Sequence, residues 1–127
     1  MDGIFIEGAK NTPSINWNKE KASLDIIGKS FPENSKNFYD PVIDWLSEYQ
    51  FAKGPLLEFN FSLDYISSSS VISLLEIIKK LGDLFSEGYN VKVIWSYDEG
   101  DDDIRTIGES YSRISDVPFE YFEQCED

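Results

Sequence analysis

The sequence predicts a small α/β sandwich in which one layer of helices covers a mixed β-sheet. Three observations lead to this prediction. Strand-like segments, in which apolar and polar residues alternate, are interspersed along the chain with helix-like segments. Strand–helix–strand units imply parallel neighbouring strands that are joined by right-handed crossovers. The strands also carry polar residues at alternate positions, which indicates that helices cover mainly one face of the sheet.

The predicted strands differ in how regularly apolar and polar residues alternate along them. In the segment 57–63, Leu57, Phe59, Phe61 and Leu63 alternate with polar residues. The segment 89–98 alternates in the same way. The segment 23–28 is a third strand candidate, and 15–18 could pair with it as a hairpin. The stretches "FIEG" and "FEYFEQ", near the two ends of the chain, are weaker candidates for edge strands.

The first predicted helix lies within "NSKNFYDPVIDWLSEYQ" and contains a proline. A proline in a helix interior clashes with the preceding turn, whereas the first helical position tolerates it. Two positions for the N-terminus of this helix are therefore possible. Either Asp40 caps the helix and Pro41 is its first residue, or the helix begins near Asn34 and bends at Pro41.

Two further helices follow. The second is expected from about Ser68 to Phe85, with apolar residues so widely spread that much of its circumference, Ile72 included, should be buried. The third is expected from about Asp101 to Ile114. It carries acidic residues in its first turn, where the helix dipole favours negative charge.

Composition limits the partners and the compartment. A chain of 127 residues suits one domain, residues 1–127. Its net charge of −13 argues against a basic surface for nucleic acid or an anionic membrane, and leaves a basic protein surface as a partner. No apolar run approaches the ~20 residues of a membrane span, and the acidic start does not resemble a signal peptide. We therefore expect a cytoplasmic protein.

The residue types that are absent exclude several chemistries. The chain has no histidine, which excludes histidine-based catalysis and histidine metal sites. Its single cysteine, Cys125, leaves almost no ligands for a transition metal, and we expect no cofactor. Carboxylates cluster at Asp98–Asp103 and could hold Ca²⁺ or Mg²⁺, although their spacing is not that of an EF-hand. The other interpretations are a solvated loop that caps the third helix and a surface that steers a basic partner.

Four consecutive serines, Ser67–Ser70, precede the second helix. Serine is a favoured helix cap, so Ser67 or Ser68 could cap the helix while the others bond nearby backbone groups. A hydroxyl at this place could also be phosphorylated. The phosphate would add about −1.5 to −2 charge, which a helix N-terminus stabilises, and would repel a partner docked beside Asp64. The two roles are compatible, because different hydroxyls can serve each.

The chain resembles the SiaC family of bacterial regulatory phosphoproteins, which are related in shape to STAS-type anti-sigma-factor antagonists. The resemblance covers roughly residues 12–122. It lies in the order and spacing of "TPSI", "SFPENS", "FYDPVIDWL", "FNFSLDYISSSS" and "WSYDEGDDD". It implies a STAS-like mixed β-sheet with helices mainly on one face. It also implies a single regulatory domain with no catalytic residues of its own.

The resemblance further implies a partner switch. In the family, a serine/threonine kinase of the anti-sigma type phosphorylates a hydroxyl at the start of the second long helix, and a metal-dependent serine phosphatase removes the phosphate. The unmodified protein binds and activates a diguanylate cyclase. Cyclic di-GMP then rises, which favours biofilm formation.

The family motif assigns the site residues. It reads tyrosine, any residue, asparagine, threonine, serine, serine, and Tyr65 sets its register here. Ser68 then takes the place of the threonine and is the expected phosphorylation site, with Ser69 and Ser67 as rivals. The expected partner-binding residues are Tyr65, Ser67, Ser68, Ser69 and Ser70. Two alternatives remain open: a constitutive adaptor whose serines are structural, and an enzyme in which Asp98 and Asp101 hold a divalent metal.

Overall fold

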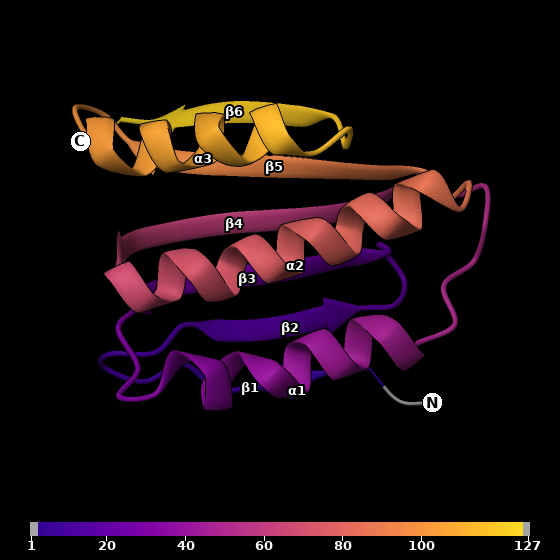
Figure 1. Cartoon of the computed structure of the whole chain (residues 1–127), viewed down its shortest axis with the longest axis horizontal. Helices are drawn as coiled ribbons and strands as arrows, with labels where there is room; N and C mark the ends of the chain where they lie inside the picture. The colour runs from indigo at the N-terminus through magenta and orange to yellow at the C-terminus, as the bar shows by residue number, and fades with distance from the viewer. Residues whose placement is uncertain (1–2, 126–127) are drawn as a thin grey trace.

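The fold is a six-stranded mixed sheet with three helices, as observed in a computed structural model that describes residues 3–125. The sheet follows chain order from β1 to β6 (Figure 1). The pairs β1–β2 and β2–β3 are antiparallel, and β3–β4, β4–β5 and β5–β6 are parallel. The elements are β1 (Phe5–Ile6), β2 (Ser14–Asn18), β3 (Ser23–Ser30), α1 (Ser35–Glu48), β4 (Leu57–Ile66), α2 (Ser68–Ser86), β5 (Val91–Asp98), α3 (Asp102–Ile114) and β6 (Phe119–Gln124).

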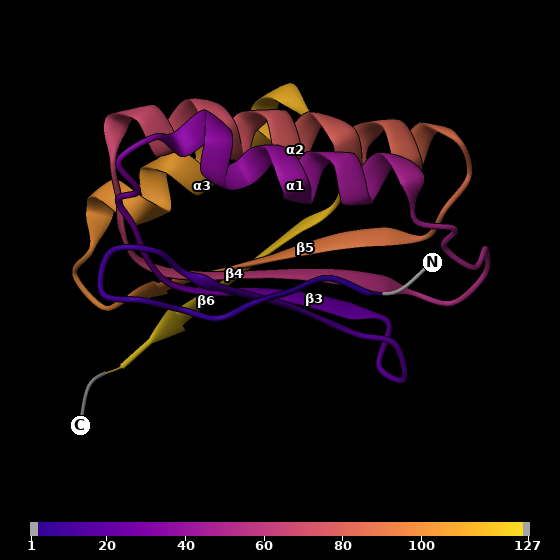
Figure 2. The same cartoon turned by 90° about the horizontal axis from the view of Figure 1, so that it is seen from below.

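All three helices lie on one face of the sheet (Figure 2). The physical reason is the strand order. From β3 to β6 every crossover moves to the next strand in the same direction, so three right-handed crossovers place their helices on the same side. The opposite face is open and partly polar, and on it the Asn60 amide donates to the Asp25 carboxylate at 2.7 Å. The predicted mixed sheet with helices on one face is confirmed.

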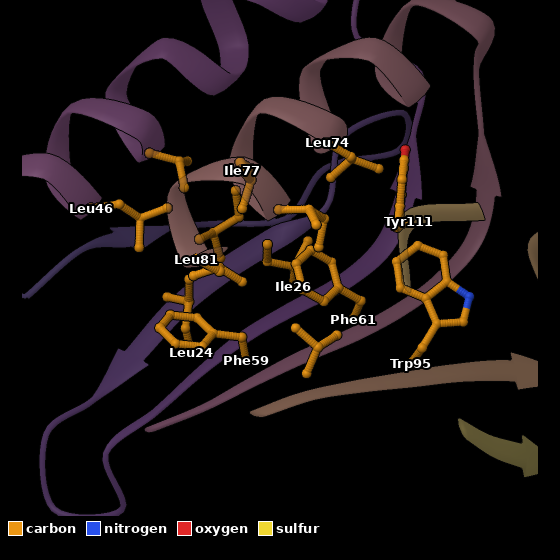
Figure 3. Close-up of a cluster of buried hydrophobic side chains, with 14 of the residues drawn as sticks. Leu24, Ile26, Leu46, Phe59, Phe61, Leu74, Ile77, Leu81, Trp95 and Tyr111 are labelled. Atoms are coloured by element: carbon orange, nitrogen blue, oxygen red, sulfur yellow. The ribbon is translucent and has the colours of Figure 1, made fainter. Parts of the chain in front are cut away.

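The core lies between the sheet and this helix layer (Figure 3). Alternate residues of β4 and β5 point into it, and they meet a stripe of α2. Trp45 and Trp95 belong to this core, with 6% and 1% of their surface exposed. The core residues labelled in the figure are Leu24, Ile26, Leu46, Phe59, Phe61, Leu74, Ile77, Leu81, Trp95 and Tyr111.

The start of α1 decides between the two predicted alternatives. The helix begins at Ser35, and the Asn34 side chain caps it by accepting a hydrogen bond from the backbone N–H of Asn37 at 3.0 Å. The alternative in which Asp40 caps the helix and Pro41 is its first residue is therefore wrong. Pro41 lies inside the helix at an exposed position. Proline has no N–H to donate to the preceding turn, and water can bond the carbonyl oxygen that is left without this donor.

One expectation about α2 is also wrong. Ile72 was expected to be buried, but 65% of its surface is exposed. At about 100° per residue, Ile72 lies about 200° around the helix axis from the fully buried Leu74. The buried stripe of α2 therefore covers one side only. Within residues 3–125, none of the helices is long and apolar enough to cross a membrane.

Candidate functional site at the start of α2

The four serines lie at one end of the sheet, where β3 and β4 end and α1 and α2 begin. We call this region the serine end and define it as Ser30, Ser35, Tyr39 and Ser67–Ser70. Because β3 to β6 are parallel, their carboxyl ends share one side of the molecule (Figure 1). The acidic loop after β5 is therefore at the same end as the serines.

Ser67 is the cap of α2. Its Oγ accepts a hydrogen bond from the backbone N–H of Ser70 at 3.3 Å, and its own N–H donates to the Ser30 carbonyl at 2.9 Å. The second bond ties the first residue after β4 to the last residue of β3. Of the two capping candidates that the sequence offered, Ser67 is the one that caps.

Ser70 is the centre of a buried hydroxyl network. The side chain is fully buried, and its Oγ accepts hydrogen bonds from the hydroxyls of Ser30 and Ser67, both at 2.8 Å. It donates its own proton to the Ser30 carbonyl at 3.1 Å. Both lone pairs and the single proton of Ser70 are thereby used. Throughout residues 3–125, no buried side-chain nitrogen or oxygen lacks a partner.

Tyr39 of α1 completes the network. Its hydroxyl lies 2.6 Å from Ser30 Oγ. Because the only proton of Ser30 is directed to Ser70, Tyr39 must be the donor in this contact. Burial raises the pKa of Tyr39 to about 12, against the opposing effect of the hydrogen bond with Ser30. The phenol therefore keeps its proton at physiological pH and remains a donor.

The two remaining serines are exposed and differ from each other. Ser69 Oγ lies 2.7 Å from the hydroxyl of Ser35, the first residue of α1, which is 5% exposed. Ser68 is the first residue of α2, and among the described residues nothing forms a hydrogen bond with its hydroxyl. Four identical side chains thus occupy different environments, and Ser68 alone among them presents an unengaged hydroxyl to solvent.

Tyr65 is exposed because β4 contains a bulge. The register of β3 with β4 shifts between Gly28 and Lys29, so that Asp64 is skipped in the pairing. The extra residue turns both Asp64 and Tyr65 outward and Ile66 inward. Tyr65 is 48% exposed, and its ring lies 5.7 Å from that of Phe31, which is 56% exposed. An aromatic pair therefore flanks the start of α2.

The acidic loop has a structural role of its own. Asp101 caps α3 by accepting a hydrogen bond from the backbone N–H of Ile104 at 3.1 Å, and Asp102 and Asp103 occupy the first turn. In the part of the chain that the structure describes, no group of three or more histidine, cysteine or acidic residues is arranged to hold a metal ion.

A model of the SiaC family of regulatory phosphoproteins matches residues 6–124 of the chain. The chain belongs to this family. It is thus a regulatory phosphoprotein, as the resemblance of its motifs implied. One curated relative, an uncharacterised protein of Pseudomonas aeruginosa (strain UCBPP-PA14), is 28% identical over 119 residues, which are 94% of each chain.

Solved structures of SiaC from Pseudomonas aeruginosa are similar to this fold. One is SiaC in complex with the diguanylate cyclase SiaD, of which SiaC is the activator. It has a TM-score of 0.85 and 26% identity, and the match covers 95% of this chain and 99% of that chain. The structure of apo-SiaC has a TM-score of 0.79 and 25% identity, over 96% and 99% of the two chains.

Sequence reasoning did not find every residue of the site. Ser30, Ser35 and Tyr39 join the serine run through hydrogen bonds that span 9 to 40 positions of the chain. No local pattern announces such contacts. The segment "SFPENS" contains Ser30 and Ser35, but its sequence shows only the family resemblance and not these contacts.

Proposed function

We propose that this protein is a partner switch that phosphorylation of Ser68 controls. In its unphosphorylated form it binds and activates a diguanylate cyclase, as SiaC of Pseudomonas aeruginosa is described to do for SiaD. A serine/threonine kinase of the anti-sigma type adds the phosphate, and a metal-dependent serine phosphatase removes it. The protein acts in the cytoplasm, has no catalytic activity of its own and controls biofilm formation through cyclic di-GMP.

The position of Ser68 carries the proposal. Its hydroxyl is exposed and unengaged at the first residue of α2, while Ser67 and Ser70 are 5% and 0% exposed and are bonded in the network. A kinase can reach Ser68 without breaking any hydrogen bond of the fold. The first turn of α2 contains no acidic residue, so the helix dipole there can stabilise an added phosphate.

The surroundings of Ser68 suit a protein partner. Phe31 and Tyr65 expose their rings beside the start of α2, and Ile72 lies one turn after Ser68 on the same side of the helix. Exposed aromatic and aliphatic side chains are typical of the buried centre of an interface. The carboxylates of the acidic loop lie at the same end of the sheet, and the chain has a net charge of −13. We expect a partner surface with an apolar centre and basic residues around it.

A phosphate on Ser68 would act on the complex rather than on the fold. It would place about −1.5 to −2 charge within the apolar part of this surface, and a bound partner would have to strip its hydration. Ser68 takes no part in the hydroxyl network, so the free protein keeps its structure. The expected result is loss of the partner from an intact domain.

The test compares substitutions of Ser68 in cyclase binding and activation. Purified variants are titrated onto a diguanylate cyclase of the same organism, and both the Kd and the formation of cyclic di-GMP from GTP are measured. We expect Ser68→Ala to bind and activate like the wild type, and Ser68→Asp to bind about tenfold more weakly or worse. Ser110→Asp adds the same charge at an exposed position of α3 and serves as the control.

The outcomes separate the proposal from its alternatives. Equal affinity of the wild type, Ser68→Ala and Ser68→Asp for the cyclase would contradict the switch and favour a constitutive adaptor. Phosphate found only outside Ser67–Ser70, after incubation with the kinase and MgATP, would contradict the site. Catalytic turnover by the isolated protein would favour the alternative of an enzyme in which Asp98 and Asp101 hold a divalent metal, if that turnover depends on the metal and is lost in Asp98→Asn.

A further inference from the structure

The four serine hydroxyls point in different directions because successive residues of a helix are about 100° apart. Ser70 points to the core, where it bonds Ser30 and Ser67. Ser69 points toward α1, where its Oγ lies 2.7 Å from that of Ser35. Ser68 points to solvent. Burial removes Ser67 and Ser70 from the reach of a kinase, so the choice of acceptor lies between the two exposed residues, Ser68 and Ser69.

We infer that Ser35, on α1, determines which of these two serines is phosphorylated. Its hydroxyl, 2.7 Å from Ser69 Oγ, is a much closer partner for Ser69 than Ser67 Oγ at 3.4 Å. Ser35 therefore holds the hydroxyl of Ser69 against α1 and leaves Ser68 as the free acceptor. The inference rests on the proposed function, because it concerns the kinase of that switch. In the transfer, the serine oxygen attacks the γ-phosphorus of ATP, the bond from phosphorus to the ADP oxygen breaks, and the hydroxyl proton passes to a base of the kinase.

The contact between Ser35 and Ser69 is hard for Ser35 to replace. Within residues 3–125, the only other side-chain hydroxyl bonded to that of Ser35 is Ser70 Oγ at 3.4 Å, and both lone pairs of Ser70 are already used by Ser30 and Ser67. If Ser69 rotates outward to meet a kinase, the buried hydroxyl of Ser35 loses its good partner. The loss of one hydrogen bond of this kind changes an equilibrium constant by about three- to tenfold. We expect Ser68 to be favoured over Ser69 by about that factor on this ground alone.

The packing around Ser69 agrees with this role. Ser69 and Ser35 line the same shallow pocket of about 350 Å³, together with Asn34, Lys36 and Ile72 among others. The Lys36 ammonium lies 2.9 Å from the Asp40 carboxylate, and this exposed ion pair weakens the attraction of Lys36 for a phosphate at Ser69. An acceptor hydroxyl at Ser69 therefore has neither a free orientation nor an unpaired lysine beside it. Ser68 does not line this pocket.

The first experiment maps phosphate on variants of Ser35. Wild type, Ser35→Ala, Ser35→Thr and Ser47→Ala are incubated with the purified anti-sigma-type kinase and MgATP, and peptide fragmentation measures the share of phosphate on Ser68 and Ser69. We expect that share on Ser69 to rise about three- to tenfold in Ser35→Ala. Ser35→Thr keeps the hydroxyl and should restore the wild-type ratio. Ser47→Ala removes an exposed hydroxyl elsewhere on α1 and should change nothing.

An unchanged ratio in Ser35→Ala would overturn the inference even if Ser68 is the main acceptor. A rise in Ser69 phosphate that Ser35→Thr does not reverse would also overturn it, because loosened packing rather than the hydroxyl would then be the cause. Absence of phosphate from Ser67–Ser70 in every variant would instead contradict the proposed function.

A second experiment decides the inference without a kinase. Three-bond couplings between Hα and Hβ protons report, by NMR, whether a serine side chain holds one rotamer or averages over several. We expect Ser69 to hold one rotamer in the wild type and to average in Ser35→Ala, while Ser68 averages in both. Averaged couplings at Ser69 in the wild type would show that Ser35 does not hold it and would overturn the inference.

Discussion

The starts of α2 and α3 lie at the same end of the sheet but are built from different groups (Figure 1). The cap of α3 is the carboxylate of Asp101, and two further acids, Asp102 and Asp103, occupy its first turn. The cap of α2 is the neutral hydroxyl of Ser67, and its first turn contains no acid. Both caps provide a hydrogen-bond acceptor for backbone N–H groups at the helix start, which have no partner within the helix.

The difference shows where a new negative charge can be added. At α3 the dipole already faces carboxylates, so a phosphate there would meet like charges. At α2 only hydroxyls face the dipole, and the buried ones are bonded to one another. A hydroxyl cap thus leaves the dipole at a helix start available to stabilise a phosphate that a kinase adds. At a carboxylate cap, the dipole already stabilises the charge of the carboxylate.

The largest effect should come from removing the centre of the hydroxyl network. In Ser70→Ala, the buried hydroxyls of Ser30 and Ser67 both lose their acceptor. We expect the free energy of unfolding to fall by about 3 kcal/mol, because unsatisfied buried polar groups are costly. Chemical denaturation measures it. Ser73→Ala, also in α2 and largely buried, is the control and should change stability by less than about 0.5 kcal/mol. Equal stability of the two variants would show that the network contributes little.

A smaller effect is expected where α3 meets the sheet. A Cβ at Gly108 would lie 2.5 Å from ring atoms of the buried Trp95, whose indole N–H donates to the Ile104 carbonyl. Gly108→Ala should therefore destabilise the fold by about 2 kcal/mol, after the better helix propensity of alanine is allowed for. Thermal unfolding followed by tryptophan fluorescence measures this. Gly82→Ala in α2 meets no such contact and should be neutral or stabilising, so a similar loss there would refute the explanation.

The carboxylate cap of α3 can be tested by substitution of Asp101. Asp101→Ala removes the acceptor for the Ile104 N–H and should cost about 1 kcal/mol. Asp101→Ser keeps a capping oxygen without the charge and should recover most of that loss. If the two variants are equally unstable in urea, the charge at this start rather than the cap hydrogen bond is what matters.

The smallest effect is also the most direct test of the contrast between the two starts. Ser68→Asp should stabilise the free protein by about 0.5 kcal/mol at low salt, because α2 has no acid in its first turn, and the gain should shrink as salt is added. Adding a charge to α3 by Thr106→Asp, beyond its acidic first turn, should give no such gain. Destabilisation by Ser68→Asp would mean that the start of α2 does not tolerate negative charge.

Much of the fold could be predicted because its signals are local. The alternation in 57–63 and the apolar stripe of the second helix placed β4 and α2 within a few residues of their observed bounds. The sequence does not decide the cap of α1, because Asp40–Pro41 and Asn34 both give valid local starts. It does not reveal the exposure of Ile72 either, because a helical sequence shows which residues are apolar, and tertiary packing selects which of them are covered.

Local sequence patterns are enough to predict the order of the elements, the one-sided helix layer and the serine-rich start of the second long helix. These follow from periodicity, crossover handedness and capping chemistry, which act over a few residues. The differences among the four serines, in contrast, arise from packing between distant segments. Ser35 contacts Ser69 from another helix, Tyr39 of that helix bonds Ser30, and Ser30 in turn bonds Ser70. A bulge in β4 turns Tyr65 outward against its alternation. Such contacts depend on which distant segments pack together, which no local pattern encodes.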